Sequence, residues 1–203
     1  MQLSITLIRH GLTAANQERR YVGQLSNPPL AAEGRRLLEE YKARGCYPRA
    51  DALYVSPLLR CQETARLIYP MLVPVTLASL TELDFGSFEG KNYDQLKDDP
   101  AYRRWIDTAG MAAPPGGEGG ETFGQRLEGA LRQIAEDASR RSIRCPAIVT
   151  HGGCIMSMLS RLAGQGPEAG RDFYEYQTPN GGGYTAYLDT DTLALTAITP
   201  LSL

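Results

Sequence analysis

The sequence predicts an α/β domain with a largely parallel sheet, and three observations support this prediction. Segments typical of strands alternate with segments typical of helices along 203 residues. Two short apolar runs, 3–8 and 147–150, end alike: one is followed by Arg9-His10-Gly11 and the other by His151-Gly152-Gly153. Hydrophobic residues (42%) and charged residues (22%) occur at proportions ordinary for a globular domain. The length suits one domain, which we expect to span residues 1–203.

The first half of the chain contains strand–helix units. The first strand ends at Ile8, and the next helix, 31–42, is predicted from Leu37, Leu38 and Tyr41 at helical spacing. Further strands are expected at 51–55 and 73–77. Between these two strands, Ser56 is expected to cap a helix that has Pro57 in its first turn and runs to Ile68.

The second half continues the alternation. We expect helices at 93–97, 101–107, 122–140 and 153–162, and strands at 146–150, 184–188 and 193–198. The stretch 110–120, centred on Pro114-Pro115-Gly116-Gly117, breaks the pattern, and composition alone favours a flexible surface linker. Because it interrupts a compact domain, a lid or insertion around 80–120 that covers a pocket is the alternative.

Charge and composition exclude several classes of protein. A formal charge of -2 argues against a nucleic-acid partner. The N-terminal residues lack the features of a secretory signal, and no apolar window is long enough to span a bilayer. The absence of such a window predicts no membrane partner. The four cysteines show no paired spacing, which indicates reduced thiols in a cytoplasmic protein. The sequence carries no signal for a particular oligomeric state.

The residues at the strand ends indicate a phosphate site. In an α/β sheet the carboxyl ends of the strands border the ligand-binding crevice, so His10 and His151 could face one pocket. Arg9 lies beside His10, and Arg60 lies in the first turns of the helix that follows the second strand. Two guanidinium groups match phosphate oxygens and would keep the imidazole of His10 neutral and nucleophilic. A metal site is a minor alternative, because these arginines would repel a dication.

Four ordered sequence blocks resemble the histidine phosphatase superfamily, in its phosphoglycerate mutase-like branch. They are Leu7-Ile8-Arg9-His10-Gly11-Leu12-Thr13-Ala14-Ala15-Asn16, Ser56-Pro57-Leu58-Leu59-Arg60-Cys61-Gln62-Glu63-Thr64-Ala65, Glu82-Leu83-Asp84-Phe85-Gly86-Ser87-Phe88-Glu89-Gly90 and His151-Gly152. The resemblance implies a three-layer α/β/α sandwich with a mostly parallel central sheet.

The resemblance also implies roles for individual residues. His10 would be the nucleophile that forms a phosphohistidine, and Arg9, Arg60 and His151 would hold the phosphoryl oxygens. Glu82 would protonate the leaving oxygen and then activate water, with a pKa raised by the phosphate and Asp84.

Asn16, Gly23 and Gly152 would contact the substrate. The loop 23–30 is one residue longer than is usual in the family. No metal and no other cofactor is implied.

The same resemblance favours hydrolysis of a small-molecule phosphomonoester over phosphoryl exchange. After Glu82 the chain reads Leu-Asp-Phe-Gly, whereas cofactor-dependent mutases carry a Glu-Arg-His-Tyr-Gly type sequence there. Several blocks are similar to bacterial members assigned to α-ribazole 5'-phosphate dephosphorylation in cobalamin biosynthesis. The alternatives are phosphoglycerate mutase-type transfer, a non-catalytic phospho-ligand binding module and a metal-dependent hydrolase.

Overall fold

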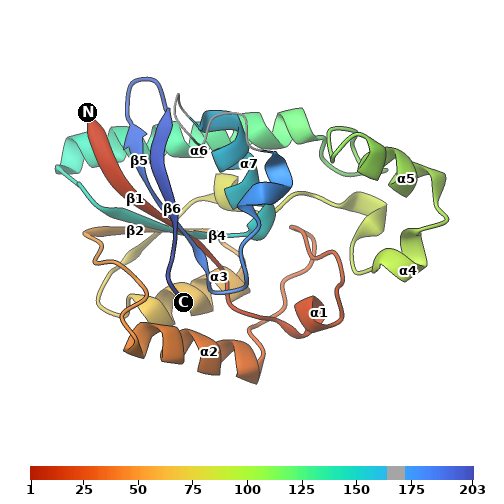
Figure 1. Ribbon diagram of the computed structural model, residues 1–203, viewed down its shortest axis with the longest axis horizontal. Coiled ribbons are helices and arrows are strands. Elements are labelled where there is room, and N and C mark those ends of the chain that lie inside the picture. The colour runs from red at the N-terminus through yellow and green to blue at the C-terminus, as the bar shows by residue number, and fades with distance from the viewer. Residues whose placement is uncertain (164–171) are drawn as a thin grey trace.

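The computed structural model describes residues 1–163 and 172–203, in which helices cover both faces of a six-stranded sheet (Figure 1). The strand order is β3-β2-β4-β1-β5-β6. Strands β3, β2, β4 and β1 are all parallel to one another. Strand β5 runs antiparallel to β1, and β6 runs antiparallel to β5. This architecture confirms the predicted α/β fold with its mostly parallel central sheet.

The elements follow the predicted alternation. The strands are β1 (Gln2–Arg9), β2 (Ala52–Val55), β3 (Pro74–Thr76), β4 (Pro146–Thr150), β5 (Gly183–Asp189) and β6 (Leu195–Pro200). The α-helices are α1 (Ala14–Gln17), α2 (Ala32–Ala43), α3 (Leu59–Ile68), α4 (Tyr93–Leu96), α5 (Pro100–Asp107), α6 (Gly120–Arg141) and α7 (Gly152–Leu162). Short 3-10 helices are η1 (Ala78–Leu80), η2 (Gly86–Phe88) and η3 (Phe173–Tyr176).

Two hydrophobic clusters fill the space between the sheet and its helices. Successive side chains of a strand point to opposite faces, so Leu7 and Ile8 of β1 belong to different clusters. Leu7 packs in the cluster that includes Leu131 of α6, and Ile8 in the one that includes Leu38 of α2. Figure 1 shows the resulting layers, with α6 and α7 on one side of the sheet and α2 and α3 on the other.

The sequence prediction was wrong about how α3 starts. Ser56 does not cap the helix, which begins at Leu59 with Leu58 at the N-cap position and no side-chain cap. The Ser56 hydroxyl lies 2.8 Å from Nε2 of His151 instead. The same hydroxyl still accepts from the backbone N–H of Leu58 at 3.4 Å, so a long local bond persists before the helix beside the shorter contact with the neighbouring strand end.

The parallel pairing of β1 with β4 fixes the position of the residues that follow them. Arg9 is opposite Thr150 in the register, so His10 and His151 leave the sheet side by side. The backbone N–H of His10 donates to the Thr150 carbonyl at 2.9 Å, which extends the pairing past the end of β1. No helix in the described residues is long and apolar enough to cross a membrane.

Candidate active site

The structure brings the two histidines together at the carboxyl ends of β1 and β4. Their ring centroids are 5.2 Å apart, and the rings meet edge to face. Nδ1 of His10 lies 2.8 Å from the Gly11 carbonyl. A carbonyl oxygen can only accept, so Nδ1 carries the proton and Nε2 keeps its lone pair. His10 is thereby held in the tautomer that a nucleophile requires.

The surroundings of both imidazoles favour the neutral form. Burial lowers the pKa of His10 well below its usual value, and the nearby charges of Arg60 and Arg9 lower it further. The same causes hold the pKa of His151 low, again with burial as the largest. The arginine effect was predicted from the sequence, whereas the larger contribution of burial comes from the fold.

Arg60 is a buried cation without a carboxylate partner among the described residues. Its guanidinium donates to the carbonyls of Ser26 at 3.0 Å and Gly23 at 2.9 Å, while Nε has no partner. Burying an uncompensated charge is costly unless an anion pairs with it. The contacts with the 22–26 loop fix the position of this charge close to the histidines.

Arg9 presents a second guanidinium to the same place. Its Nη1 donates to the Thr178 carbonyl at 2.6 Å, and its buried Nε has no hydrogen-bond partner in the described chain. The absence of a side chain at Gly152 makes room for it, since a Cβ there would lie 3.3 Å from Nε. Arg9 therefore presents a guanidinium to an anion beside His10, and the buried charge of Arg60 adds to the positive potential there.

Glu82 is a buried carboxyl next to this cationic group, with 8% of its surface exposed. Its two oxygens accept hydrogen bonds from the backbone N–H groups of Leu83 at 2.9 Å and Gly153 at 3.0 Å. Burial raises the pKa of Glu82, and this effect outweighs the lowering by the N–H groups and the arginines.

The reason predicted for that shift was partly wrong. Asp84 does not contribute to the raised pKa of Glu82. Its carboxylate accepts from Gln24 and from the backbone N–H of Gly86 instead. Burial, which the sequence does not reveal for a residue in a loop, takes its place.

Asn16 lies at the same end of the site and is fixed by its neighbours. Its Oδ1 accepts from the backbone and hydroxyl of Thr13 and from Nδ2 of Asn180. Asn180 also donates to the carbonyl of His10 at 3.2 Å, so one amide links the two residues. Asn180 was assigned no role from the sequence.

A cavity of about 440 Å³ opens beside these residues. We call the part lined by Arg9, His10, Asn16, Glu82 and Gly152 the phosphate end. Arg60 and His151 lie behind it, fully buried, rather than on its surface. Gly23 lies outside the lining: its N–H donates to the Glu89 carboxylate and its carbonyl accepts from Arg60.

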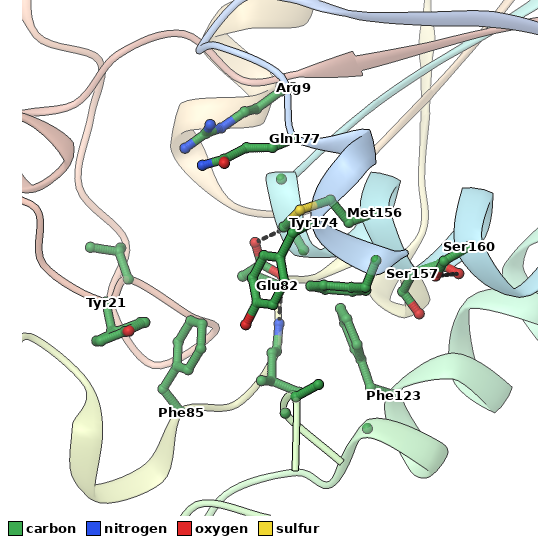
Figure 2. Close-up of a pocket in the computed structure, with 18 of the residues that line it drawn as sticks. Arg9, Tyr21, Glu82, Phe85, Phe123, Met156, Ser157, Ser160, Tyr174 and Gln177 are labelled. Carbon is green, nitrogen blue, oxygen red and sulfur yellow. Dashed lines mark hydrogen bonds between the residues drawn. The ribbon is translucent and has the colours of Figure 1, made fainter. Parts of the chain in front are cut away.

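The remaining lining is mostly apolar. We call this part the aromatic half; it includes Tyr21, Phe85, Trp105, Phe123, Met156 and Tyr174. Figure 2 shows Arg9 and Gln177 together at one end, and Tyr21, Phe85, Phe123 and Tyr174 grouped away from them. Tyr93, a further aromatic residue, is outside this cavity and exposed on α4.

The Gly- and Pro-rich stretch 110–120 borders the cavity at both of its ends, through Gly110, Met111 and Gly120. Its centre is attached to the segment after Glu82, because the Pro115 carbonyl accepts from the backbone N–H of Ser87 at 2.9 Å. This attachment differs from the free surface linker that the composition favours.

The donor set at the site suits an anion better than a metal ion. Two imidazoles and one carboxyl lie among two guanidinium groups, whose charges would repel a dication. Within residues 1–163 and 172–203, no group of three or more His, Cys, Asp or Glu side chains is close enough to hold a metal.

Fold and site together define an α/β enzyme of phosphoryl transfer with a histidine at the centre of its site. Comparison with protein families agrees: the profile of the Histidine phosphatase superfamily (branch 1) matches residues 5–186. The chain belongs to this superfamily.

Two similar proteins carry different descriptions. The adenosylcobalamin/alpha-ribazole phosphatase of Escherichia coli (strain K12) is 31% identical over 171 residues, which cover 82% of each chain. A protein of Klebsiella pneumoniae (strain 342) described as probable phosphoglycerate mutase GpmB is 32% identical, over 79% of this chain and 76% of its own.

Solved structures show the same division. The alpha-ribazole phosphatase from Shigella flexneri superposes with a TM-score of 0.78 at 28% identity and covers 100% of this chain and 96% of its own. A phosphoglycerate mutase from Thermus thermophilus superposes with a TM-score of 0.71 at 29% identity, covering 100% and 99%.

Proposed function

We propose that this protein is a phosphomonoesterase that hydrolyses a small-molecule phosphate through a phosphohistidine at His10, without a metal. The observation that carries the proposal is the state of His10: a neutral imidazole, with Nδ1 donating to Gly11, lies beside two arginines and faces the same cavity as Glu82. A nucleophile, an anion site and a proton donor are the components that this chemistry needs.

The reaction would proceed in two displacements. First, Nε2 of His10 attacks phosphorus, the bond from phosphorus to the ester oxygen breaks, and protonated Glu82 gives its proton to the departing alkoxide. Then Glu82, now ionised, takes a proton from water while the water oxygen attacks the phosphohistidine. The products are the alcohol and inorganic phosphate, and both side chains return to their initial states.

The arginines would stabilise this transfer electrostatically. Arg9 and Arg60 would pair with the non-bridging oxygens, whose negative charge persists through the transition state. His151, held by the Ser56 hydroxyl at 2.8 Å, would donate to the same oxygens. Asn16 and Gly152 line the phosphate end and would complete the contacts. Gly23 would contribute indirectly, by accepting from Arg60.

We propose α-ribazole 5'-phosphate as the substrate to test first. Its dephosphorylation is a step of cobalamin biosynthesis. Two of the similar proteins described above, from Escherichia coli and Shigella flexneri, are described as alpha-ribazole phosphatases. Phosphoglycerate mutase-type transfer is the second candidate, because of the likeness to GpmB at 32% identity. A non-catalytic phosphate-binding module is disfavoured by the presence of both His10 and Glu82.

Turnover of α-ribazole 5'-phosphate, assayed with a chelator present, tests this proposal. We expect release of inorganic phosphate by the wild type and its loss in His10→Ala. The alternative activity is assayed in parallel as conversion of 3-phosphoglycerate to 2-phosphoglycerate. Mutase activity without phosphate release, or hydrolysis that depends on added metal, would contradict the proposed function.

A further inference from the structure

The cavity extends well beyond the groups that would hold a phosphate. At about 440 Å³ it falls within the range of about 300–1,000 Å³ that accommodates drug-sized ligands. The phosphate end occupies only one part of the lining, and the aromatic half forms the rest. The leaving group of a phosphate held beside His10 would therefore extend into the aromatic half.

One wall of the aromatic half is an interlocked set of rings. Tyr21 packs against Phe85 with ring centroids 5.1 Å apart and against Trp105 at 5.5 Å. The Tyr21 hydroxyl lies 2.8 Å from the Tyr102 hydroxyl, and this hydrogen bond fixes the hydroxyl end of the Tyr21 side chain. Tilted and edge-to-face contacts of this kind fix the positions of the rings before any ligand binds.

The opposite wall comes from other elements. Phe123 of α6 is buried, Met156 lies on α7, and Tyr174 of η3 is 50% exposed. In Figure 2, the side chain of Tyr174 lies between those of Phe85 and Phe123. The two walls thus leave a space bounded by flat or polarizable apolar groups, to which an aromatic ring is complementary.

The positive charges in this half of the lining are already neutralised. Arg161 pairs with Glu121 at 3.0 Å and with Glu128 at 3.1 Å. Arg20 pairs with Glu18. Among the described residues of the lining, the cation left without a carboxylate partner is Arg9, at the phosphate end. A leaving group with its own carboxylate or phosphate would lose hydration here without gaining an ion pair.

Several neutral polar groups accompany the apolar walls. Ser157 lines the cavity from α7, and the buried indole Nε1 of Trp105, another lining residue, has no hydrogen-bond partner in the described part of the chain. A hydroxyl can donate or accept, so it suits a single neutral polar atom on a mostly apolar ligand.

We propose that the aromatic half is the leaving-group site and selects phosphate esters of neutral aromatic alcohols over esters that carry a second anion, with Tyr174 as a specificity-determining residue. The proposal rests on the proposed function, because it assigns the phosphate to the opposite end. It adds that discrimination comes from the alcohol part of the ester.

Primary phosphate esters of similar leaving ability test the proposal: 2-(1-naphthyl)ethyl phosphate, ethyl phosphate and 3-phosphoglycerate. We expect the wild-type kcat/KM to be at least about 100-fold higher for the naphthylethyl ester than for 3-phosphoglycerate. Tyr174→Ala should lower kcat/KM for the naphthylethyl ester about tenfold, within the range of aromatic contacts, and leave ethyl phosphate unchanged. Tyr187→Ala is the matched control, because Tyr187 is 45% exposed and lies on β5 outside the cavity.

Equal or better turnover of 3-phosphoglycerate, or an equal loss on both neutral esters in Tyr174→Ala, would overturn the proposal. Failure of the proposed function is recognised separately, as absence of a phosphorylated His10 with every ester. In that case, calorimetric titration with 2-(1-naphthyl)ethanol still tests the leaving-group site. Binding that is weakened by Tyr174→Ala but not by Tyr187→Ala would support the site. No binding by the wild type, or binding unchanged in Tyr174→Ala, would refute it.

Discussion

Glu82→Gln separates the two roles assigned to this carboxyl. Glutamine keeps the size of the side chain and one oxygen that can accept from Leu83 or Gly153, but it cannot exchange a proton. One backbone N–H loses its acceptor, at a cost of about 1–3 kcal/mol in stability. Loss of general acid catalysis costs a factor of about 10²–10⁴ in rate, or about 3–5 kcal/mol at 1.36 kcal/mol for each tenfold change.

The effect should depend on the leaving group. Hydrolysis of ethyl phosphate needs a proton donor, so its kcat should fall by about 10²–10⁴. 4-Nitrophenolate leaves without protonation, so Glu82→Gln should still release a burst of it while the phosphoenzyme, lacking its general base, accumulates.

Rapid-quench kinetics and intact mass measure these two outcomes, with Glu33→Gln as a control at an exposed carboxyl. An equal loss in the first turnover of both substrates, or no loss in either, would refute the assignment of Glu82.

Other predictions concern the surrounding groups. Arg60→Met should weaken binding of inorganic phosphate about 10- to 100-fold, the value of a charge-assisted hydrogen bond, as measured by calorimetry; an unchanged Kd would contradict the anion site. Gly153→Ala would place a Cβ 2.4 Å from Oε1 of Glu82, so kcat on ethyl phosphate should fall by about 10², with a smaller loss in the 4-nitrophenyl burst. Burial keeps the pKa of His151 well below 6.5 in the folded chain. Near and below about pH 6.5 the unfolded chain therefore binds a proton at this histidine that the folded chain does not bind, and the free energy of unfolding decreases as the pH falls. Denaturant unfolding should therefore show the stability difference between wild type and His151→Asn narrowing from about pH 8 to about pH 5; a constant difference would exclude this linkage.

The strand-end histidines could be predicted from the sequence because the signals are local. Apolar runs that end in His-Gly mark the ends of buried strands, and the carboxyl ends of neighbouring parallel strands lie at one sheet edge. The register that makes His10 and His151 neighbours, Arg9 opposite Thr150, follows from sheet pairing and carries no local signature.

Other features of the site depend on tertiary contacts. The sequence indicates a helix cap at Ser56, but α3 begins only at Leu59, and the shortest contact of the Ser56 hydroxyl is with His151. The sequence predicts that Glu82 lies in a loop and gives no sign of its burial. In the fold, the residues after β4 contact it, and the backbone N–H of Gly153 donates to its carboxyl group. Gly23 was predicted from resemblance alone, and the structure places it behind Arg60 rather than in the cavity lining.

The aromatic half likewise could not be predicted from the sequence. Tyr21, Phe85 and Trp105 come from separate segments, and aromatic residues at such positions more often serve packing. Here they do both: Trp105 is buried in the core cluster and also lines the cavity. Only the fold shows which aromatic side chains, Tyr21 and not Tyr93, border the site.

Trapping a covalent intermediate tests whether His10 is the nucleophile. The wild type is mixed with 4-nitrophenyl phosphate in the presence of a chelator, quenched in alkali to preserve phosphohistidine, and examined by intact and peptide mass. We expect one acid-labile phosphoryl group on the peptide that contains His10, absent in His10→Ala. Turnover without any phosphorylated histidine, or a phosphoryl group on another residue, would contradict it.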